Sequence, residues 1–208
     1  MENVWRREPL LLAFIALAVL VLTAIRPHDY MTWLLEVFPV LLAAPVLLLS
    51  YKSFPLTPLL YRLILIHAVI LMVGGHYTYA KVPLGFWMQD WFDFHRNHYD
   101  RIGHFMQGFE PAILAREILI RKKVLGRGAW LSLFVLSVCL AFSACYEFIE
   151  WFVALVSAEA ADAFLGTQGD VWDTQWDMFM CLIGAASALL LLSRRHDRQL
   201  AVLETARS

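Results

Sequence analysis

Charged residues are scarce in this chain of 208 residues, since Asp, Glu, Lys and Arg make up only 17% of it, against about a quarter of a typical soluble domain. The formal net charge is −1, so there is no basic surplus for binding nucleic acid. The sequence has no glycine-rich nucleotide-binding motif and no convincing arrangement of a Ser or Cys nucleophile. Its three cysteines, Cys139, Cys145 and Cys181, lie in apolar runs without CxxC spacing and are expected to be small core residues.

What the chain has instead is apolar sequence: 60% of its residues are hydrophobic and its mean hydropathy is +0.60. A transmembrane helix needs about 20 predominantly apolar residues. We therefore expect an all-α fold, a polytopic transmembrane bundle of about six helices that forms a single integral membrane domain over residues 1–208. The expected spans are 10–25, 33–50, 58–77, 99–120, 130–156 and 171–193.

Cationic residues predict the orientation of these spans, because loops rich in Lys and Arg stay in the cytoplasm. One side of the predicted bundle is richer in cations than the other, and it carries both termini. Both termini are therefore expected to be cytoplasmic, with the first span acting as an uncleaved anchor. The cations on the richer side are Arg6, Arg7, Lys52, Arg121, Lys122, Lys123, Arg127, Arg194, Arg195, Arg198 and Arg207.

The sixth span opens with an acidic stripe. Asp170, Asp173 and Asp177 stand at i, i+3 and i+7 and so share one face of a helix. Each charge near the centre of a membrane helix costs roughly 2.5–3.5 kcal/mol on insertion scales. Some neighbouring group must therefore compensate for the stripe.

Other polar residues are expected at the same depth. With a rise of about 1.5 Å per residue, His104 in the fourth span and Glu147 in the fifth lie roughly 10 Å inside the outer surface, as Asp177 does. Asp100 and His104 are four residues apart and share a face, as do Glu147 and Glu150, which are three apart. His76 ends the third span on the same side.

Carboxylates in this predicted cluster outnumber its single expected guanidinium, Arg101. Protonation, a bound metal ion or a water-filled cavity must therefore neutralise it. His, Asp and Glu on neighbouring helices are typical of metal sites in bundles, and this set suits Mg²⁺, Mn²⁺, Ca²⁺ or Zn²⁺, with the identity left open. The candidate ligands are Glu147, Asp173, Asp177, Asp100, Asp170 and His76.

Three further residues are candidates for catalysis. His104 would act as a ligand or general base, Glu150 would transfer protons, and Arg101 would hold a substrate phosphate with its planar fork. Simpler interpretations stay open: Asp100 and Asp170 as helix caps, and His104 as a helix–helix contact.

Polar residues outside the cluster are also noted. Glu110 and Glu117 lie in the fourth span, which is therefore expected to face other helices. His67 lies in the middle of the third span and is expected to bond to a neighbouring helix, whereas His196 is expected in the loop after the last span. The aromatic segment 86–91 is expected along the membrane surface, with a lid as the alternative.

Three segments carry a resemblance: 100–109 (DRIGHFMQGF), 146–151 (YEFIEW) and 166–178 (GTQGDVWDTQWDM). In order and spacing they resemble the YjdF-like family of bacterial inner-membrane proteins. The resemblance implies a small polytopic protein of the bacterial inner membrane, without established biochemistry or catalytic residues. A weaker resemblance to the VanZ-like proteins linked to teicoplanin resistance rests on Asp100, Arg101, His104, Phe105 and Glu147, with Asp170 and Asp173 as further matches. There Arg101 replaces a Lys, and Asp177 stands where that pattern has Asn.

These patterns leave three functions open. The first is a metal-dependent intramembrane hydrolase or transferase that acts on a phospholipid, a polyprenyl phosphate or another amphiphile. The second is an ion- or proton-coupled transporter, because carboxylates inside membranes mark ion paths. The third is a structural or assembly protein. Membrane lipids are the expected partners, and the oligomeric state is open.

Overall fold

The protein is an all-α membrane bundle, as the sequence predicts. The computed structural model describes residues 2–156 and 167–205, with side chains from residue 7 onward, and this part holds seven helices and no strand. Four of the helices, α2, α3, α6 and α8, are long and apolar enough to cross a membrane. The helices are α1 (Glu2–Thr23), α2 (Tyr30–Ser50), α3 (Pro58–Tyr77), α4 (Pro83–Phe92), α5 (Tyr99–Arg121), α6 (Ala129–Val156) and α8 (Asp173–Thr205).

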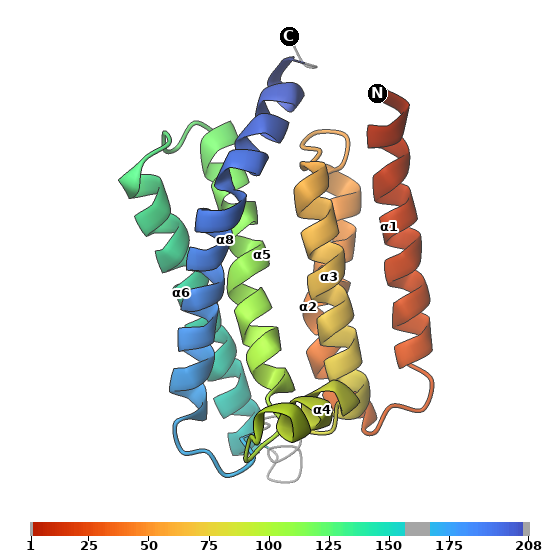
Figure 1. Cartoon of the computed structure of the whole chain (residues 1–208). Helices are drawn as coiled ribbons and strands as arrows, with labels where there is room; N and C mark the ends of the chain where they lie inside the picture. The colour runs from red at the N-terminus through yellow and green to blue at the C-terminus, as the bar shows by residue number, and fades with distance from the viewer. Residues whose placement is uncertain (1, 157–166, 206–208) are drawn as a thin grey trace.

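The helices form two groups that meet along α3 and α5 (Figure 1). Helices α5, α6 and α8 pack on one another, and α1 and α2 pack on α3. The start of α1 and the end of α8 lie at one end of the bundle and α4 crosses the other end (Figure 1). We call these the terminal end and the α4 end. The first turns of α5 and α8 therefore lie at the α4 end.

Two glycines allow α5 and α8 to touch backbone to backbone. A Cβ added at Gly108 of α5 would lie 1.8 Å from the carbonyl oxygen of Cys181. A Cβ added at Gly184 of α8 would lie 2.0 Å from the carbonyl oxygen of Phe105. Small residues at membrane helix interfaces permit this close approach. It brings the acidic first turns of α8 against the polar first turns of α5.

The last helix is longer than its predicted span, which ends at residue 193. Helix α8 continues to Thr205, and in this extension His196 and Leu200 are completely buried. The side-chain oxygen of Gln199 accepts a hydrogen bond from the backbone N–H of Leu59 at 2.9 Å, in the first turn of α3. The extension is helical because it packs against neighbouring helices, a contact that hydropathy does not report.

Exposed tryptophans on α6 match the thickness of a bilayer. Trp130 is 70% exposed near the start of this helix and Trp151 is 52% exposed near its end. Their separation of 21 residues corresponds to about 31 Å along a helix, close to the hydrocarbon thickness of about 30 Å. Tryptophan is enriched at both membrane–water interfaces. Trp87 and Trp91 on α4 are also exposed, at 55% and 67%.

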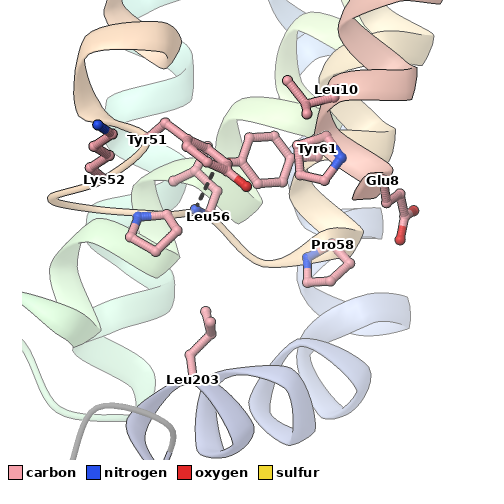
Figure 2. A pocket seen from close by; sticks show the side chains of 10 residues that line it. Glu8, Leu10, Tyr51, Lys52, Leu56, Pro58, Tyr61 and Leu203 are labelled. Carbon is pink, nitrogen blue, oxygen red and sulfur yellow. Dashed lines mark hydrogen bonds between the residues drawn. The ribbon is translucent and has the colours of Figure 1, made fainter. Parts of the chain in front are cut away.

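A cavity of about 630 Å³ lies at the terminal end, between the start of α1, the α2–α3 connection and the end of α8 (Figure 2). Apart from Glu8 and Lys52 its lining is apolar or aromatic. It lies at the opposite end of the bundle from the predicted polar cluster. The side chains that line it are Glu8, Pro9, Leu10, Tyr51, Lys52, Pro55, Leu56, Pro58, Tyr61 and Leu203.

Candidate metal centre

A clasp between two loops aligns the starts of α5 and α8. The side-chain oxygen of Gln168 accepts from the backbone N–H of Asn97 at 3.0 Å, and its amide nitrogen donates to the Asn97 carbonyl at 2.8 Å. The Asn97 side chain accepts from the N–H of Tyr99 at 3.0 Å, in the first turn of α5, and donates to the Val82 carbonyl at 3.0 Å. The clasp holds residue 96 beside the first turn of α8.

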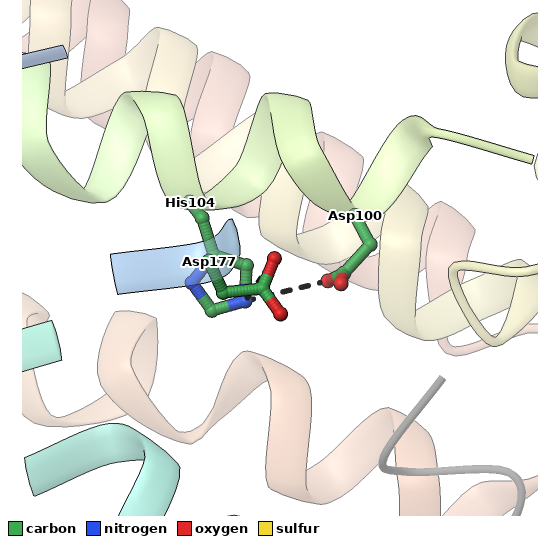
Figure 3. A group of neighbouring side chains, drawn as sticks. All are labelled: Asp100, His104 and Asp177. Atoms are coloured by element: carbon green, nitrogen blue, oxygen red, sulfur yellow. Dashed lines mark ion pairs between the residues drawn. The ribbon is translucent and has the colours of Figure 1, made fainter. Parts of the chain in front are cut away.

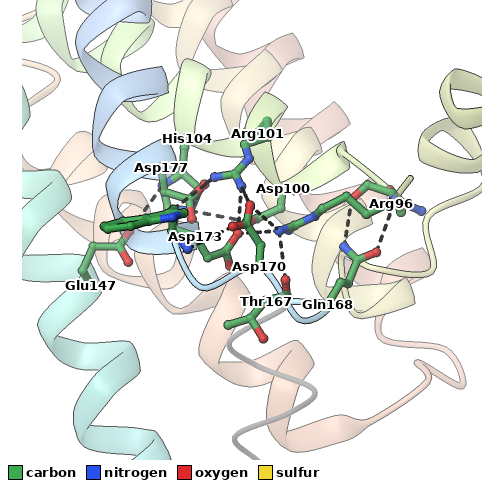
Figure 4. A network of polar contacts seen from close by, with 12 residues as sticks. Arg96, Asp100, Arg101, His104, Glu147, Thr167, Gln168, Asp170, Asp173 and Asp177 are labelled. Carbon is green, nitrogen blue, oxygen red and sulfur yellow. Dashed lines mark hydrogen bonds and ion pairs between the residues drawn. The ribbon is translucent and has the colours of Figure 1, made fainter. Parts of the chain in front are cut away.

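Two arginines meet the aspartate stripe (Figure 4). Arg101 donates from Nη1 to Asp177 Oδ1 at 2.6 Å, and from Nη2 to Asp173 Oδ1 at 2.9 Å and Asp170 Oδ2 at 3.0 Å. Arg96 donates from Nη1 to the same Asp173 oxygen at 2.7 Å. The sequence predicts Arg101 as the single guanidinium beside the stripe. The structure adds a second one, because Arg96 reaches Asp173 from the loop before α5.

His104 lies between two carboxylates from different helices (Figure 3). Its Nε2 is 3.5 Å from Asp100 Oδ1 on α5 and 3.8 Å from Asp177 Oδ1 on α8. One ligand atom from each of these residues lies within 4.8 Å of the other two. The His104 and Asp177 side chains are 6% and 2% exposed. Two carboxylates and an imidazole at this spacing have the geometry of a partial coordination shell for a divalent cation.

Glu147 of α6 approaches the same imidazole from the other side. Its Oε1 lies 3.8 Å from His104 Nδ1, too far for a hydrogen bond. The side chain is 6% exposed, and Oε1 has no hydrogen-bond partner within the described residues. Glu150, one turn further on, is buried and interacts electrostatically with Glu147 and His104. A buried carboxylate oxygen without a partner is unfavourable and marks a position where a ligand would be stabilised.

Glu36 of α2 is a member of the cluster that the sequence reasoning missed. Its side chain is buried, accepts a hydrogen bond from the Tyr146 hydroxyl at 3.3 Å and interacts electrostatically with Asp100 and His104. The missed signal was a single carboxylate inside an otherwise apolar predicted span. The described cluster thus has seven carboxylates and two guanidinium groups, from Glu36, Asp100, Glu147, Glu150, Asp170, Asp173, Asp177, Arg96 and Arg101.

His76 is a predicted ligand that the structure places elsewhere. Its Nδ1 lies 2.8 Å from the carbonyl oxygen of Thr23, at the end of α1. The helix end is at the expected depth, but the imidazole faces α1 and not the cluster.

Asp170 precedes α8, which begins at Asp173, so only Asp173 and Asp177 of the predicted stripe share a face of this helix. One carboxylate oxygen of Asp170 accepts the Trp172 N–H at 2.9 Å, just before α8, and the other accepts from Arg101. Asp100 lies in the first turn of α5, where a carboxylate is favourable, and is also 3.5 Å from His104. A helix-terminal role and membership of the cluster therefore coexist. Gly166, the first residue of the third motif, lies outside the described residues.

His98 precedes α5 at the edge of the cluster. Burial lowers the pKa of this imidazole below its ordinary value, and the positive charges of Arg96 and Arg101 lower it further. His98 is therefore neutral at pH 7 and adds no positive charge to balance the acidic groups.

A second polar cluster, at the terminal end, forms around the completely buried Glu117. Glu117 accepts from the Thr57 hydroxyl at 2.7 Å and from Arg121 Nη1 at 2.6 Å, and His196 Nε2 is 3.0 Å away. Arg116 Nη1 lies 2.9 Å from the other nitrogen of His196. The expectation that His196 lies in a loop is wrong, because α8 extends past it. These contacts join α3, α5 and α8.

Comparisons with known proteins identify the family that the three sequence motifs resemble. Residues 8–198 match the family model described as "Predicted membrane protein (DUF2238)". The chain is 52% identical over 196 residues to "Inner membrane protein YjdF" of Escherichia coli (strain K12), covering 93% of this chain and 94% of that protein. No solved structure matches the chain.

The match to the family model includes all three motifs and every residue of the polar cluster. The chain is similar to an inner membrane protein of Escherichia coli, and four of its described helices are long and apolar enough to cross a bilayer. Together with the family match, these findings support a multi-pass location in the inner membrane. The chain belongs to the family of predicted membrane proteins (DUF2238).

Proposed function

We propose that this protein is a metal-dependent enzyme whose site lies at the α4 end of the bundle and acts on a lipid or lipid-linked substrate. The supporting observation is the group formed by Asp100, His104 and Asp177, whose ligand atoms lie within 4.8 Å of one another. A second observation is independent of it: Oε1 of Glu147, buried and without a hydrogen-bond partner among the described residues, lies 3.8 Å from His104.

In this proposal Asp100, His104 and Asp177 are the metal ligands, with His104 binding through Nε2, while Glu147 lies on the Nδ1 side of the imidazole and orients it. Two carboxylates and one imidazole, with water in the remaining positions, favour Mg²⁺, Mn²⁺ or Ca²⁺, and Zn²⁺ also accepts such a set. The ion would polarise a phosphoryl or carbonyl oxygen and lower the pKa of a bound water. Glu150 is within electrostatic reach of His104 and Glu147 and is assigned the transfer of a proton.

The two arginines are assigned to positioning. Arg101 donates to Asp170, Asp173 and Asp177, so it fixes the first turns of α8 against α5. Holding a substrate phosphate would require Arg101 to leave at least one of these carboxylates. Asp173 and Asp170 accept from both arginines and are therefore assigned to this ion-pair network in preference to direct metal ligation.

A lipid substrate is supported by the depth of the site. Glu147 precedes the exposed Trp151 by four residues, about 6 Å along α6, so the cluster lies just inside the level that Trp151 marks. The exposed Trp176 of α8 and the exposed Trp172, which directly precedes α8, flank the aspartate stripe. Such a site faces lipid headgroups and the start of their acyl chains. The distribution of cations in the sequence supports cytoplasmic termini, an orientation that would put the α4 end on the outer side of the membrane.

Ion-coupled transport is a second candidate. The observation in its favour is that Glu36 and Glu150 are buried among other carboxylates, an arrangement typical of proton and cation paths. A transporter predicts cation- or proton-dependent uptake into vesicles. A purely structural cluster predicts neither uptake nor metal binding.

Metal analysis of purified protein separates these functions. The variants are Asp177→Asn and Glu147→Gln, with the exposed Glu204→Gln as matched control. We expect wild type and control to retain close to one equivalent of a divalent ion after gel filtration in Mg²⁺ or Mn²⁺. Asp177→Asn should lose the ion, and Glu147→Gln should bind it more weakly because the contact that orients His104 is changed, while both variants remain monodisperse. If folded wild-type protein binds no divalent ion by calorimetry with Mg²⁺, Mn²⁺, Ca²⁺ or Zn²⁺, the metal-dependent enzyme is excluded.

A further inference from the structure

Glu110 of α5 and His67 of α3 meet midway between the two polar clusters. His67 Nδ1 lies 3.1 Å from Glu110 Oε2. Glu110 is eleven residues from each end of α5, roughly 16 Å along the helix in both directions. His67 is equally central in α3, nine residues from Pro58 and ten from Tyr77. The pair therefore lies near the middle of the membrane.

Only one oxygen of Glu110 is accounted for. The Glu110 side chain is 9% exposed and that of His67 is 13% exposed. Oε2 of Glu110 faces the imidazole, but Oε1 is buried and has no hydrogen-bond partner within the described residues. An ionised carboxylate in a medium of low polarity is stable only when its oxygens are hydrogen-bonded or paired.

The surroundings of Glu110 supply acceptors and few donors. Pro111 follows it in α5 and has no N–H, so the carbonyl of Gln107 loses its usual helical donor. The titratable groups that face Glu110 are His67 of α3 and Cys139 of α6. The Cys139 thiol is directed to the carbonyl of Gly108 at 3.7 Å. Neither neighbour carries a fixed charge, and no Lys or Arg among the described residues forms an ion pair with Glu110.

We propose that Glu110 and His67 form a proton-binding site at the centre of the membrane, with Oε1 of Glu110 as the atom that takes up the proton. Uptake from water forms one O–H bond and breaks none in the protein. Oε2 then acts as a carbonyl oxygen and accepts the Nδ1–H of a neutral imidazole. The loaded pair, with a protonated Glu110 and a neutral His67, carries no net charge.

This site is separate from the proposed metal centre and does not depend on it. Glu110 is six residues from His104 along α5, and none of the three proposed ligands takes part in the pair. A proton-binding group at this depth, between the clusters at the two ends, is placed to couple the protein to the proton gradient of the membrane.

Infrared difference spectroscopy of the purified full-length protein tests the proposal. The spectrum of Glu110→Gln is subtracted from that of wild type at pH 7, with Glu204→Gln as the control. We expect wild type to show a protonated-carboxyl C=O band that Glu110→Gln lacks and the control keeps. If folded Glu110→Gln gives the wild-type spectrum in this region from pH 5 to pH 8, Glu110 holds no proton and the proposal is overturned.

A second variant keeps the test decisive if Glu110→Gln does not fold. His67→Gln retains the carboxyl but replaces the donor to Oε2, so the C=O band should persist at a shifted frequency. An unshifted band would show that the protonated carboxyl is not the one paired with His67, which also overturns the proposal. Repeating both measurements after chelation of divalent ions separates this site from the metal centre, because the band should not change.

Discussion

Nη1 of Arg101 on α5 lies 2.6 Å from Oδ1 of Asp177 on α8, and both side chains are at most one-tenth exposed. The same guanidinium also pairs with Asp173 and Asp170, so one side chain forms ion pairs with all three aspartates of the stripe. This relationship explains part of how the acidic start of α8 is tolerated in the membrane.

Replacing Arg101 should therefore destabilise the protein strongly. We expect Arg101→Gln to lower the free energy of unfolding by about 3–5 kcal/mol, because removing one partner leaves buried carboxylates without compensation. Arg101→Lys should recover only part of this, since an ammonium cannot donate in a planar fork. Denaturant unfolding in detergent measures both variants. The half-exposed Arg62, paired with Glu8, provides the control, and Arg62→Gln should cost less than about 1 kcal/mol. Equal losses for Arg62 and Arg101 would contradict the interpretation.

The glycine contact between α5 and α8 gives a second prediction. Gly108→Ala would place a Cβ 1.8 Å from a backbone carbonyl and Gly184→Ala one at 2.0 Å, so the two helices must separate. We expect a loss of more than about 4 kcal/mol for each, at the severe end of point mutations. The change is measured as the midpoint of thermal unfolding and the yield of monodisperse protein.

Gly126 supplies the matched control for this pair. No atom lies within 4 Å of a Cβ added there, so Gly126→Ala should leave the unfolding midpoint within experimental error. Wild-type midpoints for Gly108→Ala and Gly184→Ala would show that the helices are not in backbone contact.

Glu117 at the terminal end gives a third prediction. Its carboxylate accepts from Thr57 and Arg121 and lies beside His196, with no exposure to solvent. Glu117→Ala should lower the free energy of unfolding by about 3–5 kcal/mol, because it leaves buried charged donors without an acceptor. Glu204→Ala, at an exposed position of α8, should change it by less than about 0.5 kcal/mol. Urea unfolding followed by circular dichroism compares them, and similar midpoints would refute the structural role of Glu117.

The N-cap of α2 gives a prediction with a pH dependence. Asp29 accepts the backbone N–H of Thr32 at 2.7 Å, and this bond holds the pKa of Asp29 below its ordinary value. The contribution to stability is thus complete above pH 3.8 and disappears as the pH falls through the lowered pKa. Asp29→Ala should cost about 1 kcal/mol at pH 7. The difference from wild type should vanish in strong acid, as thermal unfolding between pH 2 and pH 7 can check. A constant difference across that range would argue against the cap.

The sequence predicted the depth of the site residues in the membrane better than the direction in which their side chains point. Depth along a helix follows from residue number, so the meeting of His104, Glu147 and Asp177 was predictable. The direction of a side chain around the helix axis does not follow from residue number. His76 was therefore assigned to the cluster, although its imidazole faces Thr23. Arg96 was missed because it lies in a loop, where neither depth nor direction follows from periodicity.

The bounds of a helix were predicted correctly where the apolar stretch and the helix begin and end at the same residues. Helix α3 coincides with its predicted span, and α5 and α6 differ from theirs by one residue. Helix α8 outlasts its apolar stretch because His196 and Leu200 are buried by neighbouring helices. Hydropathy reports transfer into lipid and carries no information about such contacts between helices.

The pairing of Arg101 with the stripe also constrains how the chain is made. Arg101 precedes Asp170 by 69 residues, so α5 is synthesised before the aspartates that pair with this arginine. Until α8 arrives, α5 exposes a guanidinium, an imidazole and several carboxylates that lipid disfavours. Insertion of α8 therefore completes the bundle and also supplies the counter-charges that stabilise α5. A chain truncated after α6 should be degraded by membrane quality control.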